Sequence, residues 1–344
     1  MQIDRYRPED RPEVDALFRR VFGAARADAS ARRWHWQYFC NPNAREPQIW
    51  IARDAGSIVG QYATMPVRLA VGDKEVDASW GMDVMVAPER QRQGLGEKLF
   101  QTWDRHTGAS LGMGLSVSSH RLFRKLKWPD MGAVPCLVKP LTPRALRRPR
   151  WPRAANVAMS LLGSIAVPVL RERGPVDPDV RKIEHFDARF TDLWQRVAPR
   201  FAFAVRRDAE YLEWKYVDPP HLDYSIVALD RGGRIDGYAV VRHADEARAR
   251  VTSLVDFLAD PEDTLAVEAL LRSVERDARH ARSDKIRTFV MNAAFRRALG
   301  KRGYFRVAST VQLVAKINAV PVEPAFYLDS SRWHVTFGDS DQDR

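Results

Sequence analysis

The spacing of apolar residues predicts amphipathic helices at matching places in the two halves of the chain. Near the start, apolar residues recur at intervals of three and four, which is the period of one helix face. They are Val14, Leu17, Phe18, Val21 and Phe22. Gly23 is placed to end this helix. The same spacing returns later at Phe190, Leu193, Trp194 and Val197.

Other features recur in the same order after each of these helices. An aromatic cluster ending in proline spans Trp36–Pro42 in the first half and Trp214–Pro220 in the second, 178 residues further on. A hairpin pattern follows each cluster, with Asp and Gly between runs of β-forming residues, over 49–63 and 225–240. The recurrence predicts a duplicated unit, in which the second aromatic cluster faces or mirrors the first.

The remaining pattern completes a mixed α/β plan in each half. A helix is predicted around Leu95, Leu99 and Trp103, and another around Leu265, Ala269 and Leu270. Each half then ends with a short helix that leads to an aromatic residue, over 122–128 and 298–305. The fold class predicted from this order is α/β, or α+β mixed, with two tandem domains.

A basic and apolar stretch separates the two halves. We divide the chain into a first domain over 1–142, a linker over 143–180, a second domain over 181–330 and a flexible acidic tail over 331–344. The linker contains an uncharged run, Ala154–Leu170, which is too short and too interrupted by Gly and Pro to make a good membrane span. A helix packed between the domains is the favoured interpretation, and a basic helix lying on a membrane surface is the alternative.

Composition narrows the possible functions. The 344 residues are 45% hydrophobic and 29% charged, which is enough apolar material for a folded core. The net charge of +11 suits an anionic ligand, but no nucleic-acid-binding pattern accompanies it, so nucleic acid is not expected as a partner. Only Cys40 and Cys136 are present, which excludes a disulfide framework and an all-cysteine zinc site. The start of the chain has no signal-peptide core, so a cytoplasmic location is expected.

The most informative segment is Met82–Phe100, in which a strand leads through a glycine-containing turn into a helix. Glycines at the start of a helix leave backbone N–H groups uncovered, and the helix dipole adds positive potential there. Such a turn is a ready site for a pyrophosphate. Arg90 and Arg92 add charge nearby.

This segment resembles the acetyl-CoA loop of the GCN5-related N-acetyltransferase (GNAT) superfamily, which reads Q/R-x-x-G-x-G/A. The residues that match are Gln91, Arg92, Gln93, Gly94, Leu95 and Gly96. The ending L-F-R-K-L-K-W, Leu122–Trp128, is also similar to that family's closing motif. The resemblance covers 1–140 well and 180–315 in outline, and it implies two tandem GNAT-like domains, each a twisted mixed sheet flanked by helices.

The resemblance also implies a reaction and its cosubstrate. Acetyl-CoA would bind with its pyrophosphate on the loop and its pantetheine arm along the strand Val84, Met85 and Val86, which pairs with it as an added strand. An amine would attack the thioester directly in a V-shaped gap between two central strands. No metal and no covalent enzyme nucleophile are expected. The partner is a small-molecule amine, no transmembrane segment is expected, and a homodimer is possible.

The residues of the chemical step are less well defined by the sequence. Asp83 is the best-placed candidate base. The family's usual tyrosine acid aligns with Phe123, which is expected beside the cosubstrate but has no proton to give. Ser116, Ser118, Ser119 or His120 are candidate replacements, with Ser118 and His120 carried forward as candidate catalytic residues.

Candidate substrate-binding residues are drawn from two places. Glu75 and Asp77 lie on what we expect to be the strand before the gap, from which they could reach it. Trp36 and Tyr38 belong to an aromatic cluster, which also contains Trp34, that is expected to be partly exposed because three aromatics in five residues cannot all face one interior.

The second half lacks the loop. Its aligned segment, Ala259–Leu271, has no glycine at the turn, and Asp260, Glu262 and Asp263 would repel a phosphate. A single active site in the first domain is therefore predicted. Two alternatives stay open: a regulatory acetyl-CoA-binding protein without catalysis, and a Fem-like aminoacyl transferase.

Overall fold

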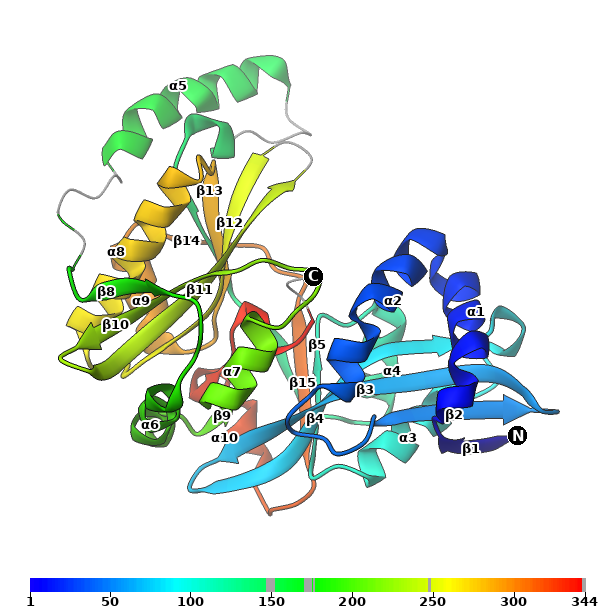
Figure 1. Cartoon of the computed structure of the whole chain (residues 1–344). Coiled ribbons are helices and arrows are strands. Elements are labelled where there is room, and N and C mark those ends of the chain that lie inside the picture. Colours follow the sequence, from blue (N-terminus) through cyan, green and yellow to red (C-terminus); the bar gives the residue numbers. More distant parts are fainter. Residues whose placement is uncertain (147–151, 170–174, 176, 247–248, 342–344) are drawn as a thin grey trace.

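Two mixed β-sheets flanked by helices form the molecule (Figure 1). The computed structural model describes residues 1–146, 152–169, 175, 177–246 and 249–341. The larger sheet has the strand order β1-β2-β3-β4-β5-β15-β6, with β9 added beside β3 and β16 beside β9. The smaller sheet has the order β14-β7-β13-β12-β11-β10-β8.

The strands of the larger sheet are β1 (Gln2–Arg5), β2 (Ile49–Asp54), β3 (Ser57–Val71), β4 (Lys74–Val86), β5 (Ala109–Met113), β6 (Asp130–Ala133), β9 (Phe203–Val205), β15 (Gln312–Ile317) and β16 (Trp333–His334). The strands of the smaller sheet are β7 (Cys136–Pro140), β8 (Val180–Ile183), β10 (Ser225–Arg231), β11 (Arg234–Glu246), β12 (Ala249–Ala259), β13 (Lys285–Phe289) and β14 (Phe305–Val307).

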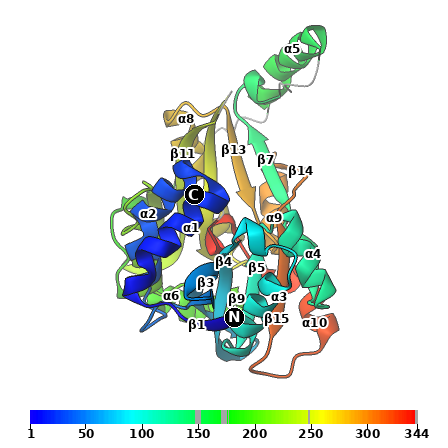
Figure 2. The same cartoon turned by 90° about the vertical axis from the view of Figure 1, so that its right-hand side faces the viewer.

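The helices predicted from apolar spacing are present in both halves. In the first half α1 (Arg11–Phe22) and α2 (Ala24–Phe39) cover one face of the larger sheet, and α3 (Leu95–Arg105) and α4 (Val117–Lys125) cover the other (Figures 1 and 2). The remaining helices are α5 (Arg153–Val169), α6 (Ala188–Val197), α7 (Ala209–Tyr216), α8 (Thr264–His280), α9 (Ala293–Lys301) and α10 (Pro324–Leu328). Both predicted hairpins are confirmed, as the antiparallel pairs β2–β3 and β10–β11.

The two halves exchange strands. Strand β7 comes from the first half of the sequence, yet it pairs with β13, with Leu137 opposite Thr288. Strand β15 comes from the second half, yet it pairs with β5, with Leu313 opposite Met113. The units are therefore not the consecutive segments 1–142 and 181–330 expected from the sequence, because each sheet needs a strand from the other half.

A reciprocal contact between two tryptophans joins the halves at α2 and α7. The rings of Trp36 and Trp214 stack with their centroids 5.1 Å apart. The indole N–H of Trp36 donates to the carbonyl oxygen of Trp214 at 2.7 Å, and the indole N–H of Trp214 donates to that of Trp36 at 3.0 Å. Such mutual contacts are expected when two copies of one unit meet about a two-fold axis. The aromatic clusters thus face each other, as predicted.

The predicted partial exposure of the first aromatic cluster is wrong. Trp34, Trp36 and Tyr38 are all buried. Three aromatics within five residues can be buried together here because α2 is covered on two sides. Trp34 and Tyr38 pack in the first half, and Trp36 packs against the second half.

The predicted flexible tail is also wrong for the described residues. The segment from Trp333 to Ser340 is buried. It lies beside β12 and β13, whose parallel pairing ends at Leu254 and Thr288. Thr336 forms an antiparallel bridge with Val290, next to the end of β13, and its hydroxyl donates to the Asp256 carboxylate of β12 at 2.8 Å.

A buried charge network fixes this C-terminal segment. The Arg207 guanidinium contacts the carboxylates of Asp256 and Asp339 at 3.2 and 2.8 Å. The Lys215 ammonium donates to the carbonyl oxygen of Ser340 at 2.8 Å. Burying a charge costs free energy unless the charge is paired. These pairings therefore fix the acidic C-terminal segment in the interior.

The tryptophan pair gives a first testable prediction. We expect Trp36→Ala to lower the free energy of unfolding by about 3–5 kcal/mol, because a large buried ring is lost. Trp36→Ala and Trp214→Ala together should cost at least about 1 kcal/mol less than the two single changes added, because each removes the same contact. Urea unfolding measures these values. As a control, Trp50→Ala and Trp214→Ala should be additive, since Trp50 lies in a separate core cluster.

His334 gives a second prediction, on the pH dependence of stability. Its ring is buried against Phe201, with centroids 4.5 Å apart, and burial followed by the nearby Arg207 charge holds its pKa well below the usual range. Below about pH 6.5 the unfolded chain therefore binds a proton that the folded chain does not, and stability falls as the pH falls.

Comparison with His334→Phe isolates this contribution from the other titrating groups. Between about pH 6.5 and 5, the free energy of unfolding of the wild type should fall faster than that of the variant, by up to about 1.4 kcal/mol per pH unit. Equal slopes in urea unfolding at several pH values would show that His334 takes up its proton in the folded state.

Candidate functional site

The central strands β4 and β5 separate and leave a cleft in the larger sheet. They pair in parallel only from Ala78 opposite Ala109 to Trp80 opposite Leu111. Beyond this point β4 continues along β3, while β5 continues along β15. A cleft of about 260 Å³ opens there. It is lined by Phe22, Arg26, Tyr62, Gly81, Met82, Asp83, Val84, Phe100, Met113, Gly114, Leu115, Ser116, Ser119, Phe123 and Asp341.

A bulge in β4 shapes one wall of the cleft. The register with β3 shifts between Gln61 and Ala63, which places Asp83 and Val84 opposite Tyr62 alone. Asp83 has a φ of 29°, outside the range of a regular strand. The bulge leaves Asp83 and Val84 without a regular pairing to β3, in a part of β4 that no longer pairs with β5.

The predicted anion-binding loop lies between β4 and α3. Gly94 is the N-cap of α3 with a φ of 79°, a left-handed conformation that favours glycine. No side chain caps the helix, so its first N–H groups stay available to an anion. A Cβ placed on Gly94 or Gly96 would meet no atom within 4 Å, so the space over the loop is open.

Two glutamine side chains of the loop stabilise its conformation by hydrogen bonds to nearby backbone carbonyl groups. The Gln91 amide donates to the carbonyl oxygen of Val86 at 3.2 Å, and the Gln93 amide donates to that of Glu89 at 3.0 Å. Arg92 is exposed and has a φ of 62°. Arg90 forms an ion pair with Asp54. Leu95 packs into the core while Gly96 is only partly covered. The motif Gln91–Gly96 thus forms a mostly exposed loop that leads into α3, the helix whose Phe100 lines the cleft.

The corresponding helix of the second half has its N-terminus closed by its own residues. Asp263 is the N-cap of α8, and its carboxylate accepts from the backbone N–H of Ala266 at 2.9 Å. Arg200 pairs with Asp260 and Glu262 at 3.1 and 3.0 Å. A carboxylate already occupies the position that an anion would take. This agrees with the predicted loss of cosubstrate binding in the second half.

Asp83 lies in the cleft and is held by two residues of α2. Its carboxylate accepts from the Tyr38 hydroxyl at 2.8 Å and lies 3.6 Å from the Arg33 guanidinium. The side chains of Asp83 and Arg33 are only 8% and 9% exposed. A charge-assisted contact in a nearly dry site fixes the orientation of the carboxylate. Tyr38, expected as a substrate contact, is thus brought to the site through Asp83.

The serines and the histidine near α4 divide between two places. Ser116 caps α4, accepts from the Ser119 N–H at 3.1 Å, and lines the cleft together with Ser119. Ser118 and His120 are not among the lining residues. The His120 ring instead contacts the Asp130 carboxylate at 2.7 Å. The structure thus brings Ser116 and Ser119 to the cleft and leaves Ser118 and His120 outside it.

Glu75 and Asp77 do not reach the cleft, contrary to expectation. They lie at the other end of β4 itself, on the far side of the paired stretch Ala78–Trp80. Glu75 pairs with Arg68 and Arg206 at 3.3 Å, and Asp77 pairs with Arg68. Glu75 and Asp77 were expected on a separate strand before the one that contains Asp83. In the structure all three residues belong to the single long strand β4, with Glu75 and Asp77 at its start.

Tyr62 is a residue of the cleft that the sequence analysis missed. Its hydroxyl lies so close to Gly81 that a Cβ there would be 2.0 Å away, which is why this position requires glycine. Gly81 is the first residue of β4 beyond the pairing with β5, so the hydroxyl lies where the cleft begins. It makes no hydrogen bond with another described residue. Burial, with a smaller effect of Asp104, raises the pKa of Tyr62 well above its usual range.

An aromatic layer connects Tyr62 with Phe123. Phe100 packs against Tyr62 and Phe123, with ring centroids 4.6 and 4.8 Å away. Phe123 is buried and lines the cleft, next to the strands as expected for a residue beside the cosubstrate. A tyrosine hydroxyl is therefore present in the cleft, but it comes from β3. The only sequence signal for it was a polar aromatic residue within a predicted strand.

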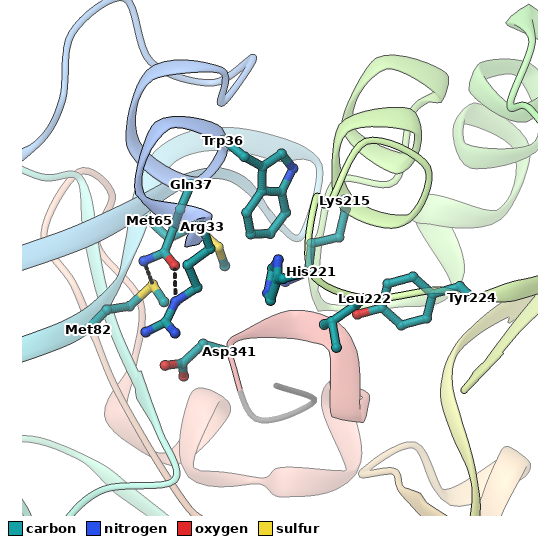
Figure 3. A pocket seen from close by; sticks show the side chains of 10 residues that line it. All are labelled: Arg33, Trp36, Gln37, Met65, Met82, Lys215, His221, Leu222, Tyr224 and Asp341. Carbon is teal, nitrogen blue, oxygen red and sulfur yellow. Dashed lines mark hydrogen bonds between the residues drawn. The ribbon is translucent and has the colours of Figure 1, made fainter. Parts of the chain in front are cut away.

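The C-terminal segment brings the second half to the cleft. Asp341 lines both the cleft and a narrow cavity beside it (Figure 3). Figure 3 shows its carboxylate pointing toward Arg33 of α2, while Lys215 and His221 of the second half lie on the other side of the cavity. Trp36, expected as a substrate contact, lines this cavity and not the cleft. Residues 342–344 lie outside the described part of the chain.

Comparison with known proteins agrees with this geometry. Residues 2–118 match the family described as acetyltransferase (GNAT) domain. The search of curated proteins finds no sequence match. Among solved structures, N-myristoyltransferase from Saccharomyces cerevisiae with bound myristoyl-CoA is similar, with a TM-score of 0.59 and 13% identity over 92% of this chain and 78% of that one.

Two bacterial structures are similar over the same share of the chain. A GCN5-related N-acetyltransferase from Anabaena variabilis has a TM-score of 0.61 and 13% identity, over 92% of this chain and 72% of that one. A probable N-acyltransferase from Enterococcus faecalis has a TM-score of 0.59 and 12% identity, over 92% and 72%. Residues 2–118 therefore match the GNAT domain family, and the fold over 92% of the chain is similar to that of these N-acyltransferase structures.

Proposed function

We propose that the protein transfers an acyl group, acetyl in the first instance, from acyl-CoA to a small-molecule amine at a single site in the first half. The observation that carries this proposal is that β4, which lines the cleft, leads into the uncapped start of α3, whose Phe100 also lines the cleft. An anionic pyrophosphate fits the start of α3, and an extended arm that needs backbone partners fits the cleft.

The residues that would hold the CoA moiety follow from these two features. The backbone N–H groups of the loop Gln91–Gly96 would bind the pyrophosphate. The edge of β4 over Val84, Met85 and Val86 faces away from β3 and has no β5 beside it. A pantetheine arm could pair there as an added strand. The rings of Tyr62, Phe100 and Phe123 pack together where the strands part, which favours a short acyl group.

The chemical step assigns a role to two side chains. The amine nitrogen attacks the thioester carbon, the carbon–sulfur bond breaks, and the sulfur leaves with the electron pair. Tyr62 would give its proton to this sulfur, in place of the tyrosine that Phe123 replaces. Asp83, directly or through a water molecule, would take the proton that the amine loses. Val84, at the bulge, offers a backbone N–H to the oxygen on which charge develops.

CoA binding tests the loop. We expect Gly96→Leu to weaken binding of CoA at least about tenfold, because a side chain would fill the open space over the N–H groups and cost an anion its hydrogen bonds. Isothermal titration calorimetry with CoA measures this. Gly300→Leu on α9 is the matched control, because a Cβ there also meets no atom within 4 Å. Equal affinities of the two variants would contradict the assignment of the loop.

Tyr62→Phe tests catalysis separately from binding. We expect kcat with acetyl-CoA and an accepted amine to fall about 100-fold, with the affinity for CoA unchanged, because only a proton donor is removed. A thioester whose thiol has a lower pKa needs less help and should restore much of the rate. Tyr304→Phe is the control, since its buried hydroxyl also lacks a hydrogen bond among the described residues but lies outside the cleft.

The same experiment separates the proposal from a purely regulatory role. CoA binding by the wild type without thiol release on any offered amine would favour a protein that senses acyl-CoA. A rate unchanged in Tyr62→Phe would remove Tyr62 from the chemistry and leave acyl transfer standing.

A further inference from the structure

Helix α5 lies outside the packed body of the molecule. Figures 1 and 2 show it at the far end of the second half, away from the interface between the halves. The expectation that this helix packs between the two domains is therefore wrong. It packs against the short 3-10 helix η3 (Pro143–Leu146), and none of its side chains in the described part is buried.

The exposed side of α5 is its apolar side. Ala154, Val157, Ala158 and Leu161, at the spacing of one helix face, are all exposed, with Val157 and Leu161 at 58% and 65%. The opposite, partly covered side carries Asn156 and Ser160 together with Ala155 and Met159, and Ser164 is exposed at the edge of the apolar side. A helix on the surface of a water-soluble body has the reverse arrangement, with its polar side outward.

The serines of α5 direct their hydroxyls to the helix itself. Ser160 donates to the carbonyl oxygen of Asn156 at 2.8 Å, and Ser164 donates to that of Ser160 at 2.9 Å. A hydroxyl that bonds to the carbonyl four residues earlier has less need of water. The helix can therefore enter an apolar environment without leaving these groups unsatisfied.

The segment that contains α5 has charged residues of one sign. From 131 to 171 the sequence contains no Asp or Glu, and its basic residues apart from Lys139, which is buried and paired with Glu275, are Arg144, Arg147, Arg148, Arg150, Arg153 and Arg171. Arg144 on η3 and Arg153 at the start of α5 are exposed. This field attracts an anionic surface and disfavours a second copy of the chain, which would bring the same positive charges.

The length of α5 limits how it can meet a membrane. Seventeen residues make a helix about 25 Å long, less than the roughly 30 Å of a bilayer's hydrocarbon core. Among the described residues, no helix meets the length and hydropathy needed to cross a membrane. We propose that α5 lies in the surface of an anionic lipid bilayer, with Val157 and Leu161 inserted and Arg144 and Arg153 on the lipid headgroups. This inference goes beyond acyl transfer and does not depend on it.

Vesicle binding by the full-length chain tests this proposal. We expect the protein to sediment with vesicles of phosphatidylcholine containing about 30% phosphatidylserine, and much less with phosphatidylcholine alone. Val157→Asp with Leu161→Asp should reduce the partition coefficient at least about tenfold, since two apolar side chains lose their insertion. Arg144→Gln with Arg153→Gln should reduce it about 30-fold, and added salt should weaken binding of the wild type.

Two matched controls separate these effects from misfolding. Leu265→Asp changes a leucine that is 70% exposed on α8, and it should leave vesicle binding unchanged. Arg181→Gln with Lys182→Gln removes two exposed charges from β8 and should have little effect. An unchanged midpoint of urea unfolding in each variant reports an intact fold.

Three results would overturn the proposal. These are no binding of the wild type to anionic vesicles, equal binding by the α5 aspartate variant, and equal binding to neutral vesicles. Self-association in sedimentation velocity that the α5 variant abolishes, without vesicle binding, would assign this face to a second copy of the chain.

Discussion

The separation of two parallel strands is the constraint on which the rest of the structure depends. Where β4 leaves β5, the sheet loses a row of backbone hydrogen bonds that must be satisfied in some other way. The first half leaves this opening as a cleft, and β4 then leads into the uncapped N-terminus of α3. An opening of this kind destabilises the free protein and at the same time provides backbone partners for an extended ligand.

The second half resolves the same constraint with its own chain. Strands β12 and β13 also stop pairing, at Leu254 and Thr288, and the segment Trp333–Ser340 lies beside them. Thr336 contacts both strands, and Arg207 neutralises Asp256 and Asp339. Duplication thus gave two equivalent openings, one of which the protein fills permanently. The described part of this segment reaches Asp341, which lines the first cleft, so the second half contributes to the lining of that cleft.

The reciprocal contacts make the two halves inseparable. Each sheet takes its strand β7 or β15 from the other half, and Trp36 and Trp214 exchange equivalent hydrogen bonds. The cleft wall on β5 depends on β15, which comes late in the chain. The first half alone would lack this strand, which gives a physical reason for keeping a second half whose own anion site is closed by Asp263.

The sequence by itself determined the amphipathic helices α1, α3, α6 and α8, the short helices α4 and α9, the hairpins, the duplication and the glycine loop from Gln91 to Gly96. These features depend on local periodicity, on the conformational freedom of glycine and on residues close together in the chain. Only the tertiary structure decided the strand exchange, the burial of the C-terminal segment, the outward position of α5 and the approach of Tyr62 to Gly81. Most of these features depend on contacts between residues far apart in sequence, and the position of α5 depends on which of its sides packs against the rest of the molecule. No local pattern in a single sequence specifies either.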